Sequence, residues 1–276
     1  MVVSVPVANP PQRYSVDFFP GPKDRHYEID GERIIDGQEI QSVTTVLKEI
    51  GDKFGVAAWW GMKTGVAGTL QLIQSASPPG IEKMGSDEVV SALTKHKLTV
   101  NHVRDSAGDR GTSVHKAAED WARHGDIPDP HDYPDTERGY IKAFLAFLRE
   151  EGVKPVKCEV RVGSKEYAYA GTYDLEGYTD SGFALLDYKT KTSKPKGTPK
   201  AYEQNHLQLA AYETARREMG MVPTTEQYVV NLYPDGTYAL IENKATEDQW
   251  LRALDAYRAL AELKDSLRVR PKKVAA

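Results

Sequence analysis

Two aspartates and a lysine within residues 171–190 have types and spacing that suit phosphate chemistry. The turn residues 179–182 (Thr-Asp-Ser-Gly) predict a hairpin that sets Asp174 directly across from Asp187. Directly opposed residues share a face, with Cβ atoms roughly 5 Å apart, and two like charges there repel each other. Lys189 lies two residues beyond Asp187, on the same face, and offsets only part of that charge. A hard divalent cation bound by both acids would remove the conflict.

A cation held by Asp174 and Asp187 would suit hydrolysis of a phosphodiester. It would polarise a phosphoryl oxygen, lower the pKa of a bound water and neutralise charge as the bond breaks. Lys189 would orient or deprotonate the attacking water, or stabilise charge on phosphorus. The alternative is a solvated strand face with an exposed Asp–Lys salt bridge. The apolar run of residues 183–186 disfavours it, because a strand buried on both faces rarely carries charge without a partner or a function.

Other polar side chains could extend this site. His115 borders the apolar stripe of a predicted helix, where it could be structural or a third metal ligand. Gln208 and Tyr212 share one helix face and could contact a phosphate backbone or simply pack. Glu159 is a secondary candidate. A turn at residues 163–166 would place it on the Asp174 face but about 13 Å away, which disfavours metal ligation and leaves water-mediated or substrate contact open.

A basic loop follows the second predicted strand of this hairpin. Lys191, Lys194 and Lys196 lie there among proline and glycine, which predicts a flexible segment suited to phosphate contacts that weaken with salt. A loop that is merely solvated is an equal alternative. Arg110 would extend the same positive rim.

The elements that must position these residues are helices, then a β region, then helices. Apolar spacing predicts helices over residues 43–50, 111–124, 139–152 and 202–219. Strands are predicted over 156–162, 167–178 and 183–190, with a second hairpin at 227–233 and 237–243 and a final helix starting at Thr246. This order predicts an α/β or α+β fold with a central mixed sheet flanked by helices. Residues 1–100 are predicted to form an extension of strands and helices packed on a core of residues 101–276.

Composition excludes several classes of protein. The 276-residue chain has a net charge of -4, which argues against a uniformly positive nucleic-acid coat but allows a local basic groove. Cys158 is the only cysteine, so an internal disulfide, a thiolate zinc site and a cysteine-ligated iron–sulfur cluster are excluded. No apolar run reaches the length of a membrane span, and residues 1–11 lack a signal or transit pattern, so the expected location is cytoplasmic.

Four short motifs, in order, resemble the PD-(D/E)XK nuclease superfamily and, within it, the RecB-like exonucleases with their CRISPR-associated and phage-type members. They are Arg110–His115 (R-G-T-x-x-H), Gly171–Asp174 (the first acid), Asp187–Lys189 (D-x-K) and Gln208–Tyr212 (Q-x-x-x-Y). Many CRISPR-associated relatives carry four cysteines for an iron–sulfur cluster, which a single cysteine cannot supply. The resemblance is therefore to a cluster-free branch.

The resemblance implies a restriction-endonuclease-like core that uses Mg²⁺ or Mn²⁺. The implied metal ligands are the side chains of His115, Asp174 and Asp187 with the carbonyl of Tyr188; Lys189 is implied in catalysis, and Gln208, Tyr212 and Arg110 in substrate binding. The implied function is a DNA exonuclease on single strands or duplex ends in replication, recombination or repair, with proteins of those processes as partners and no membrane. Two alternatives stay open: a catalytically inactive DNA-binding or recombination scaffold of the same fold, and a metal-dependent phosphohydrolase of small substrates.

Overall fold

The computed structural model describes residues 11–21, 24–51, 55–76 and 84–268, except for the side chains of residues 55–60 and 75–76. Contacts divide the chain into two units, which we treat separately. The first unit joins Met1–Ile50 to Ala117–Ala276, and the second is Gly51–Lys116. The predicted boundary at residue 100 does not coincide with this division.

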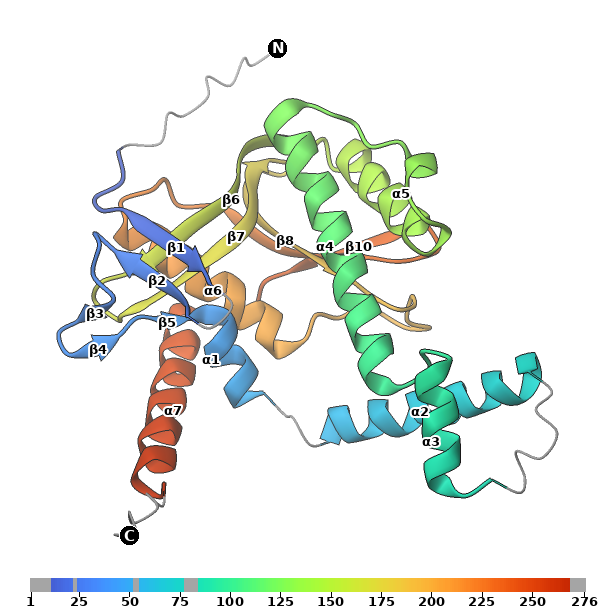
Figure 1. Ribbon diagram of the computed structural model, residues 1–276. Coiled ribbons are helices and arrows are strands. Elements are labelled where there is room, and N and C mark those ends of the chain that lie inside the picture. Colours follow the sequence, from blue (N-terminus) through green and yellow to red (C-terminus); the bar gives the residue numbers. More distant parts are fainter. Residues whose placement is uncertain (1–10, 22–23, 52–54, 77–83, 269–276) are drawn as a thin grey trace, which may run out of the picture. The chain divides into compact units, whose positions relative to one another are not determined.

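A six-stranded mixed sheet forms the centre of the first unit (Figure 1). Its strands are β5 (Gln41–Ser42), β6 (Lys154–Ser164), β7 (Tyr169–Tyr178), β8 (Phe183–Thr190), β9 (Glu226–Leu232) and β10 (Tyr238–Glu242). The order is β10-β9-β8-β7-β5, and β6 also pairs with β7. The β5–β7 and β8–β9 pairs are parallel and the others antiparallel, so the predicted mixed sheet is confirmed.

Helices cover both faces of this sheet. Helices α1 (Val43–Ile50), α6 (Glu203–Glu218) and α7 (Glu247–Ser266) share one hydrophobic core with the sheet, in which Leu185 of β8 and Trp250 of α7 are buried. On β8, Tyr188 lies three residues after Leu185 and therefore points to the opposite face. There its ring packs edge-on against Phe144 and Phe147 of α5 (Asp135–Glu150). The predicted helix-flanked sheet is thus confirmed.

The first 50 residues contribute to this core. Strands β1 (Val16–Pro20) and β2 (Arg25–Ile29) form a hairpin, and β3 (Ile34–Ile35) pairs with β4 (Gln38–Glu39). Tyr27 and Ile29 of β2 are buried in the core, and the Tyr14 hydroxyl donates a hydrogen bond of 3.0 Å to the carbonyl oxygen of Gly163. Residues 11–50 are therefore part of the main fold, whereas residues 1–10 lie outside the described chain.

The second unit is helical. It contains α2 (Gly55–Ala76), α3 (Ser86–Lys95) and the first part of α4 (Val100–His124), while a short 3-10 helix, η2 (Pro130–Asp132), belongs to the first unit. Gly68 of α2 allows a close approach to Leu98, whose carbonyl oxygen would lie 2.8 Å from an added Cβ. None of the described helices is long and apolar enough to cross a membrane.

Candidate metal centre

Strands β7 and β8 part at the two predicted aspartates. Their pairs run from Tyr178↔Phe183 to Leu175↔Leu186, which confirms the predicted turn and register. The pairing ends one step before Asp174 and Asp187. Here a carboxylate oxygen of Asp174 accepts a hydrogen bond of 2.7 Å from the backbone N–H of Tyr188. The side chain of Asp174 thus takes the place of a strand partner at this point.

An ionic network fixes β7 against α6 just beyond this point. The buried guanidinium of Arg216 on α6 pairs with Glu176 of β7, and it also donates a hydrogen bond of 2.8 Å to the Tyr173 hydroxyl. Tyr173 and Glu176 both contact Arg216, so this network holds the segment of β7 that contains Asp174.

Glu159 lies across from Asp174 on the neighbouring strand. The pairs Cys158↔Leu175 and Val160↔Tyr173 bracket these two acids. Glu159 has a φ of 50°, a left-handed conformation that is uncommon for a residue other than glycine. Such residues cost about 1–3 kcal/mol and cluster at functional sites. Strand β6 therefore departs from regular backbone geometry at the level of Asp174.

The sequence-based distance of Glu159 from Asp174 is wrong, because the turn was placed too early. Residue Gly163 was assigned to the turn but belongs to β6, which continues to Ser164. An added Cβ at Gly163 would lie 2.8 Å from Ile29 Cδ1, so glycine is needed there for close packing. A turn over residues 165–168, with Ala168 at a φ of 43°, would have predicted the observed register.

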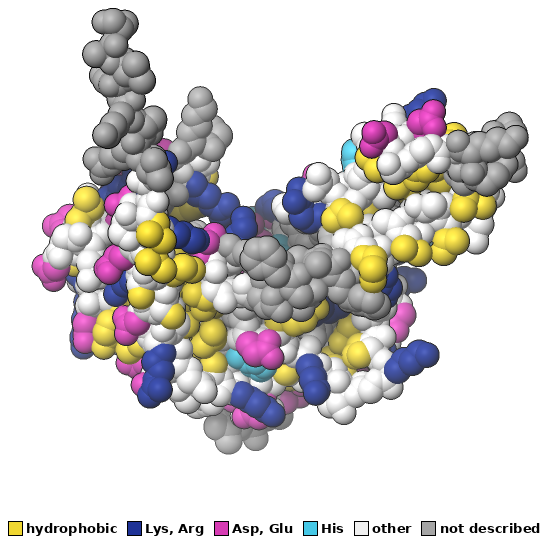
Figure 2. Space-filling view, turned by 90° about the horizontal axis from the view of Figure 1, so that it is seen from below, with side chains coloured by type: hydrophobic (Ala, Val, Ile, Leu, Met, Phe, Trp, Pro, Cys, Tyr) yellow, Lys and Arg dark blue, Asp and Glu magenta, His cyan; other side chains and the backbone are white. Residues whose placement is uncertain are grey.

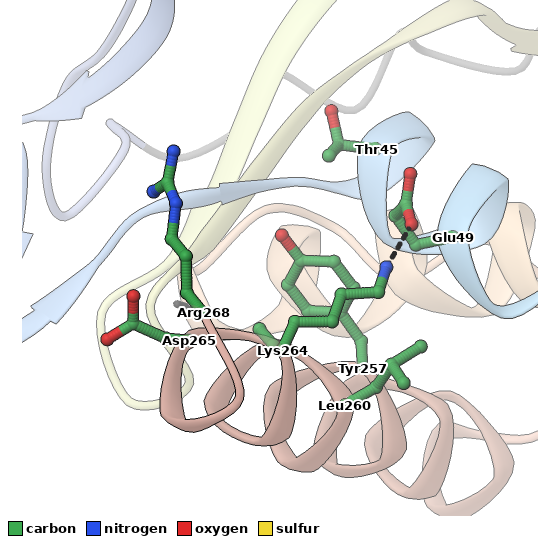
Figure 3. A pocket seen from close by; sticks show the side chains of 8 residues that line it. Thr45, Glu49, Tyr257, Leu260, Lys264, Asp265 and Arg268 are labelled. Atoms are coloured by element: carbon green, nitrogen blue, oxygen red, sulfur yellow. Dashed lines mark hydrogen bonds and ion pairs between the residues drawn. The ribbon is translucent and has the colours of Figure 1, made fainter. Parts of the chain in front are cut away.

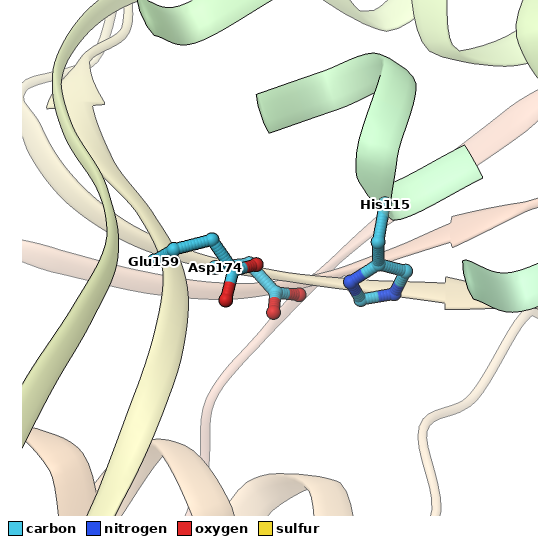
Figure 4. Close-up of side chains that lie close together, drawn as sticks. All are labelled: His115, Glu159 and Asp174. Atoms are coloured by element: carbon cyan, nitrogen blue, oxygen red, sulfur yellow. The ribbon is translucent and has the colours of Figure 1, made fainter. Parts of the chain in front are cut away.

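A histidine and two carboxylates form a group that could hold a metal ion. The group is His115, Glu159 and Asp174, whose candidate ligand atoms all lie within 4.8 Å of one another. Figure 4 shows His115 on α4 with its ring toward the acids of β6 and β7. His115 lies two residues before α4 enters the first unit, where Trp121 of the same helix packs 5.7 Å from Phe144. Asp187 is not a member of this group.

The donor set suits a hard or borderline divalent cation. Carboxylate oxygens are the ligands that Mg²⁺ and Mn²⁺ prefer, and Mn²⁺ accepts imidazole readily. All three side chains are half-buried, so an ion bound there would be accessible to solvent. The two facing carboxylates repel each other, and a bound cation would relieve that repulsion.

Asp187 and Lys189 lie beside this group as an ion pair on β8. The Lys189 Nζ atom lies 2.5 Å from a carboxylate oxygen of Asp187, which is only 1% exposed. Burial lowers the pKa of Lys189, but the carboxylates of Asp187 and Asp174 outweigh it and raise the pKa above its ordinary value. Lys189 is therefore a charged donor beside Asp187 and Asp174.

The predicted substrate residues on α6 have different environments. The Gln208 side-chain amide donates a hydrogen bond of 2.9 Å to the Tyr212 hydroxyl. Tyr212 is 1% exposed, and its ring packs on Gly171, where an added Cβ would lie 2.5 Å from a ring carbon. In this arrangement Tyr212 packs against β7. Substrate contact by Gln208 and Tyr212, and metal ligation by the Tyr188 carbonyl, stay predictions.

The basic loop starts from a fixed base. The Lys191 carbonyl oxygen accepts a hydrogen bond of 3.0 Å from the Tyr140 hydroxyl, and its ammonium lies 4.2 Å from the centre of the Tyr202 ring. Burial and the nearby Lys189 lower the pKa of Lys191 to about 8. Lys194 and Lys196 are exposed, and Arg110 lies on α4 in the second unit. Figure 2 shows Lys and Arg mixed with Asp and Glu over one face, so positive charge there is local.

Comparison with known proteins identifies one family. Residues 130–273, a little over half of the chain, match the family model of the PD-(D/E)XK nuclease superfamily. This stretch contains Glu159, Asp174, Asp187 and Lys189, whereas His115 precedes it. A crystal structure of SSO0001 is similar over 44% of this chain and 57% of that protein, with 17% identity and a TM-score of 0.30. This chain therefore spans a little over half the length of SSO0001. No curated protein matches.

Proposed function

The chain belongs to the PD-(D/E)XK nuclease superfamily, and we propose that it is a metal-dependent deoxyribonuclease that acts as an exonuclease on single strands or duplex ends. One observation carries the proposal. Glu159 and Asp174 face each other within ligand distance of His115. They lie where the pairing of β7 with β8 ends, next to the Asp187–Lys189 ion pair of β8. Acids, imidazole and a charged lysine thus converge on one place.

The side chains of the site suit hydrolysis of a phosphodiester. His115, Glu159 and Asp174 would hold a divalent cation, with Asp187 and the Tyr188 carbonyl as further candidates. When bound, Mg²⁺ or Mn²⁺ would supply Lewis-acid stabilisation of the phosphoryl oxygens. Lys189 donates hydrogen bonds from the neighbouring strand, and its ammonium would orient the attacking water or stabilise negative charge that develops on phosphorus. The Tyr188 amide keeps Asp174 in place through its hydrogen bond.

Sequence motifs support a placement in the RecB-like branch, without an iron–sulfur cluster. The motif residues His115, Asp174 and Lys189 come together in space from three separate elements. A single cysteine, Cys158, is buried beside Glu159 and cannot ligate a four-cysteine cluster. Roles in replication, recombination or repair, with partner proteins of those processes, follow from this branch.

The test is incubation of the full chain with end-labelled single-stranded and duplex DNA, in Mn²⁺, in Mg²⁺ and with a chelator. We expect cleavage with either metal, none with chelator, and products that shorten from one end. Lys189→Ala should reduce the cleavage rate by about 10²-fold or more, because one preorganised donor to developing charge is lost. Retained binding of DNA by this variant would show that the lower cleavage rate comes from the chemical step and not from weaker binding.

Two outcomes would overturn the proposal. Binding of DNA by the wild-type chain without metal-dependent cleavage would favour the inactive scaffold. Cleavage of a phosphomonoester that DNA does not inhibit would favour a small-substrate phosphohydrolase. The exposed lysines Lys194 and Lys196 lie on the basic loop that follows β8. They support a polymeric phosphate substrate rather than a small one.

A further inference from the structure

A small pocket in the first unit has a cationic lining. Its volume is about 250 Å³, and it lies between the β1–β2 hairpin and the start of α1. Its cations are Arg25 and Lys48, and the other lining side chains are those of Phe18, Tyr27, Ser42, Thr44 and Thr45. Four hydroxyl groups and two cations thus line the pocket, and no carboxylate does. This combination suits a phosphate group.

Two neighbouring pockets differ in charge. The pocket between α1 and α7 contains Lys264, but this lysine pairs with Glu49 of the same pocket at 2.9 Å (Figure 3). Another pocket, beside Tyr257, is lined by Arg258 together with Glu39 and Glu262. Both of these pockets carry their own carboxylates. The pocket of Arg25 and Lys48 therefore stands apart as a site for an anion.

The cations of this pocket are available for a ligand. The Arg25 guanidinium lies over the Phe18 ring at 5.0 Å from its centre, which orients it without neutralising its charge. Lys48 lies one helical turn after Thr44, so the two share a face of α1. Within the described residues, neither Arg25 nor Lys48 forms an ion pair with an acid. Both side chains are exposed.

Strand β7 connects this pocket to the candidate metal centre. Ser42 of β5 pairs with Ala170 of β7, four residues before Asp174. At about 3.3 Å per residue, the pocket lies roughly 13 Å from the acids along β7. Tyr27, which lines the pocket, hydrogen-bonds through its hydroxyl to Thr172 Oγ1 at 3.1 Å. One strand of DNA advances about 3.4 Å per nucleotide along the duplex axis, so this separation corresponds to a few nucleotides.

We infer that the pocket of Arg25 and Lys48 binds a phosphate of the nucleic-acid strand a few nucleotides from the bond that is cleaved. This inference rests on the proposed nuclease function. Arg25 and Lys48 are positioning residues: they fix the register of the strand over the metal centre and do not contact the reacting atoms. The phosphate is either an internal linkage or the terminal phosphate of a strand, since both offer the same charged oxygens.

The test compares the double variant Arg25→Gln/Lys48→Gln with a control of equal charge, Arg149→Gln/Arg252→Gln. The control residues are exposed and pair locally with Glu150 and Asp248. Binding of a fluorescent single strand is measured with chelator present, so that no cleavage occurs. We expect the pocket variant to bind about tenfold more weakly. The slope of log affinity against log salt should fall by about 0.7, the value for one lost phosphate contact.

Neutral methylphosphonate linkages then locate the phosphate. With wild type, one neutral linkage or removal of one terminal phosphate should weaken binding, and in the pocket variant the same change should have no further effect. Loss at an internal linkage identifies a backbone site, and loss at an end identifies a strand-end site. Arg25→Lys/Lys48→Arg should restore affinity. Equal salt slopes for the pocket and control variants would overturn the inference. So would the result that every neutral linkage weakens binding by the pocket variant as much as binding by wild type.

The binding assay separates this inference from the proposed function. If wild type cleaves DNA with metal and the pocket variant binds DNA as wild type does, the phosphate-pocket inference fails and the proposed nuclease function stands. If wild type does not cleave DNA, the proposed nuclease function fails, whereas the metal-free binding data still test the phosphate pocket. In an active enzyme, the pocket variant should raise KM and shift the cleaved positions.

Discussion

Glu159 and Asp174 combine two features that are costly for a fold. They place two carboxylates across from each other on β6 and β7, and Glu159 does so with a left-handed backbone. Repulsion and strain of this kind persist where the surrounding structure holds them, and they mark sites where a ligand is bound. The neighbouring Lys189 already pairs with Asp187, so its charge is shared. At the residue scale, these features support the proposal that the site receives a cation.

Lys191 gives a pH-dependent prediction at the same scale. Burial and Lys189 lower its pKa to about 8, so the folded chain carries this charge below pH 8 and loses it above. We expect single-stranded DNA to bind a few-fold more weakly at pH 9 than at pH 7, measured by anisotropy with chelator present. Lys191→Arg should reduce that difference, because a guanidinium stays charged throughout. The same pH dependence in both proteins would show that Lys191 does not contact the phosphate backbone.

Gly171 gives a prediction at the scale of elements, because β7 and α6 meet there. An alanine Cβ would lie 2.5 Å from the Tyr212 ring and 3.3 Å from Val43. Overpacking of this kind costs about 1–3 kcal/mol, so Gly171→Ala should lower the free energy of unfolding in urea by that amount. Gly197→Ala is the matched control, since no atom lies within 4 Å of the added carbon. Equal stability of both variants would mean that α6 does not press on β7 at this glycine.

Elements with strong local signals could be predicted from the sequence. The apolar run of β8 (Phe183–Thr190) and the periodicity of α1 (Val43–Ile50) gave bounds that the structure confirms. The start of α4 at Val100 was placed too late in the chain. The segment before residue 111 has weak amphipathic character, and two glycines, Gly108 and Gly111, lower its helix propensity.

The candidate site could be predicted only in part. The positions of Asp174, Asp187 and Lys189 at the end of the hairpin followed from the turn at residues 179–182. The nearness of Glu159 did not, because glycine at 163 served close packing and not a turn. The parting of β7 from β8 beyond Leu175 and Leu186 also has no local signal in the sequence.

At the scale of the whole molecule, charge and architecture point to local recognition of nucleic acid. The chain carries a net charge of -4, and acidic and basic side chains are interspersed over the face in Figure 2. Binding through the bulk field is therefore weak, and affinity must come from particular lysines and arginines. Helix α4 belongs to the second unit up to Lys116 and to the first unit from Ala117 onward. His115 lies one residue before the end of the second unit.

Direct titration with Mn²⁺ tests the central claim, that Glu159 and Asp174 form a metal site. The full-length wild type, Glu159→Gln, Asp174→Asn and the control Glu166→Gln are compared by calorimetry. Each ligand variant should bind Mn²⁺ at least about tenfold more weakly, because loss of even an outer-shell partner has an effect of that size. Glu166→Gln, an exposed acid on the same hairpin, should match wild type. Wild-type Mn²⁺ affinity in both Glu159→Gln and Asp174→Asn would contradict the account.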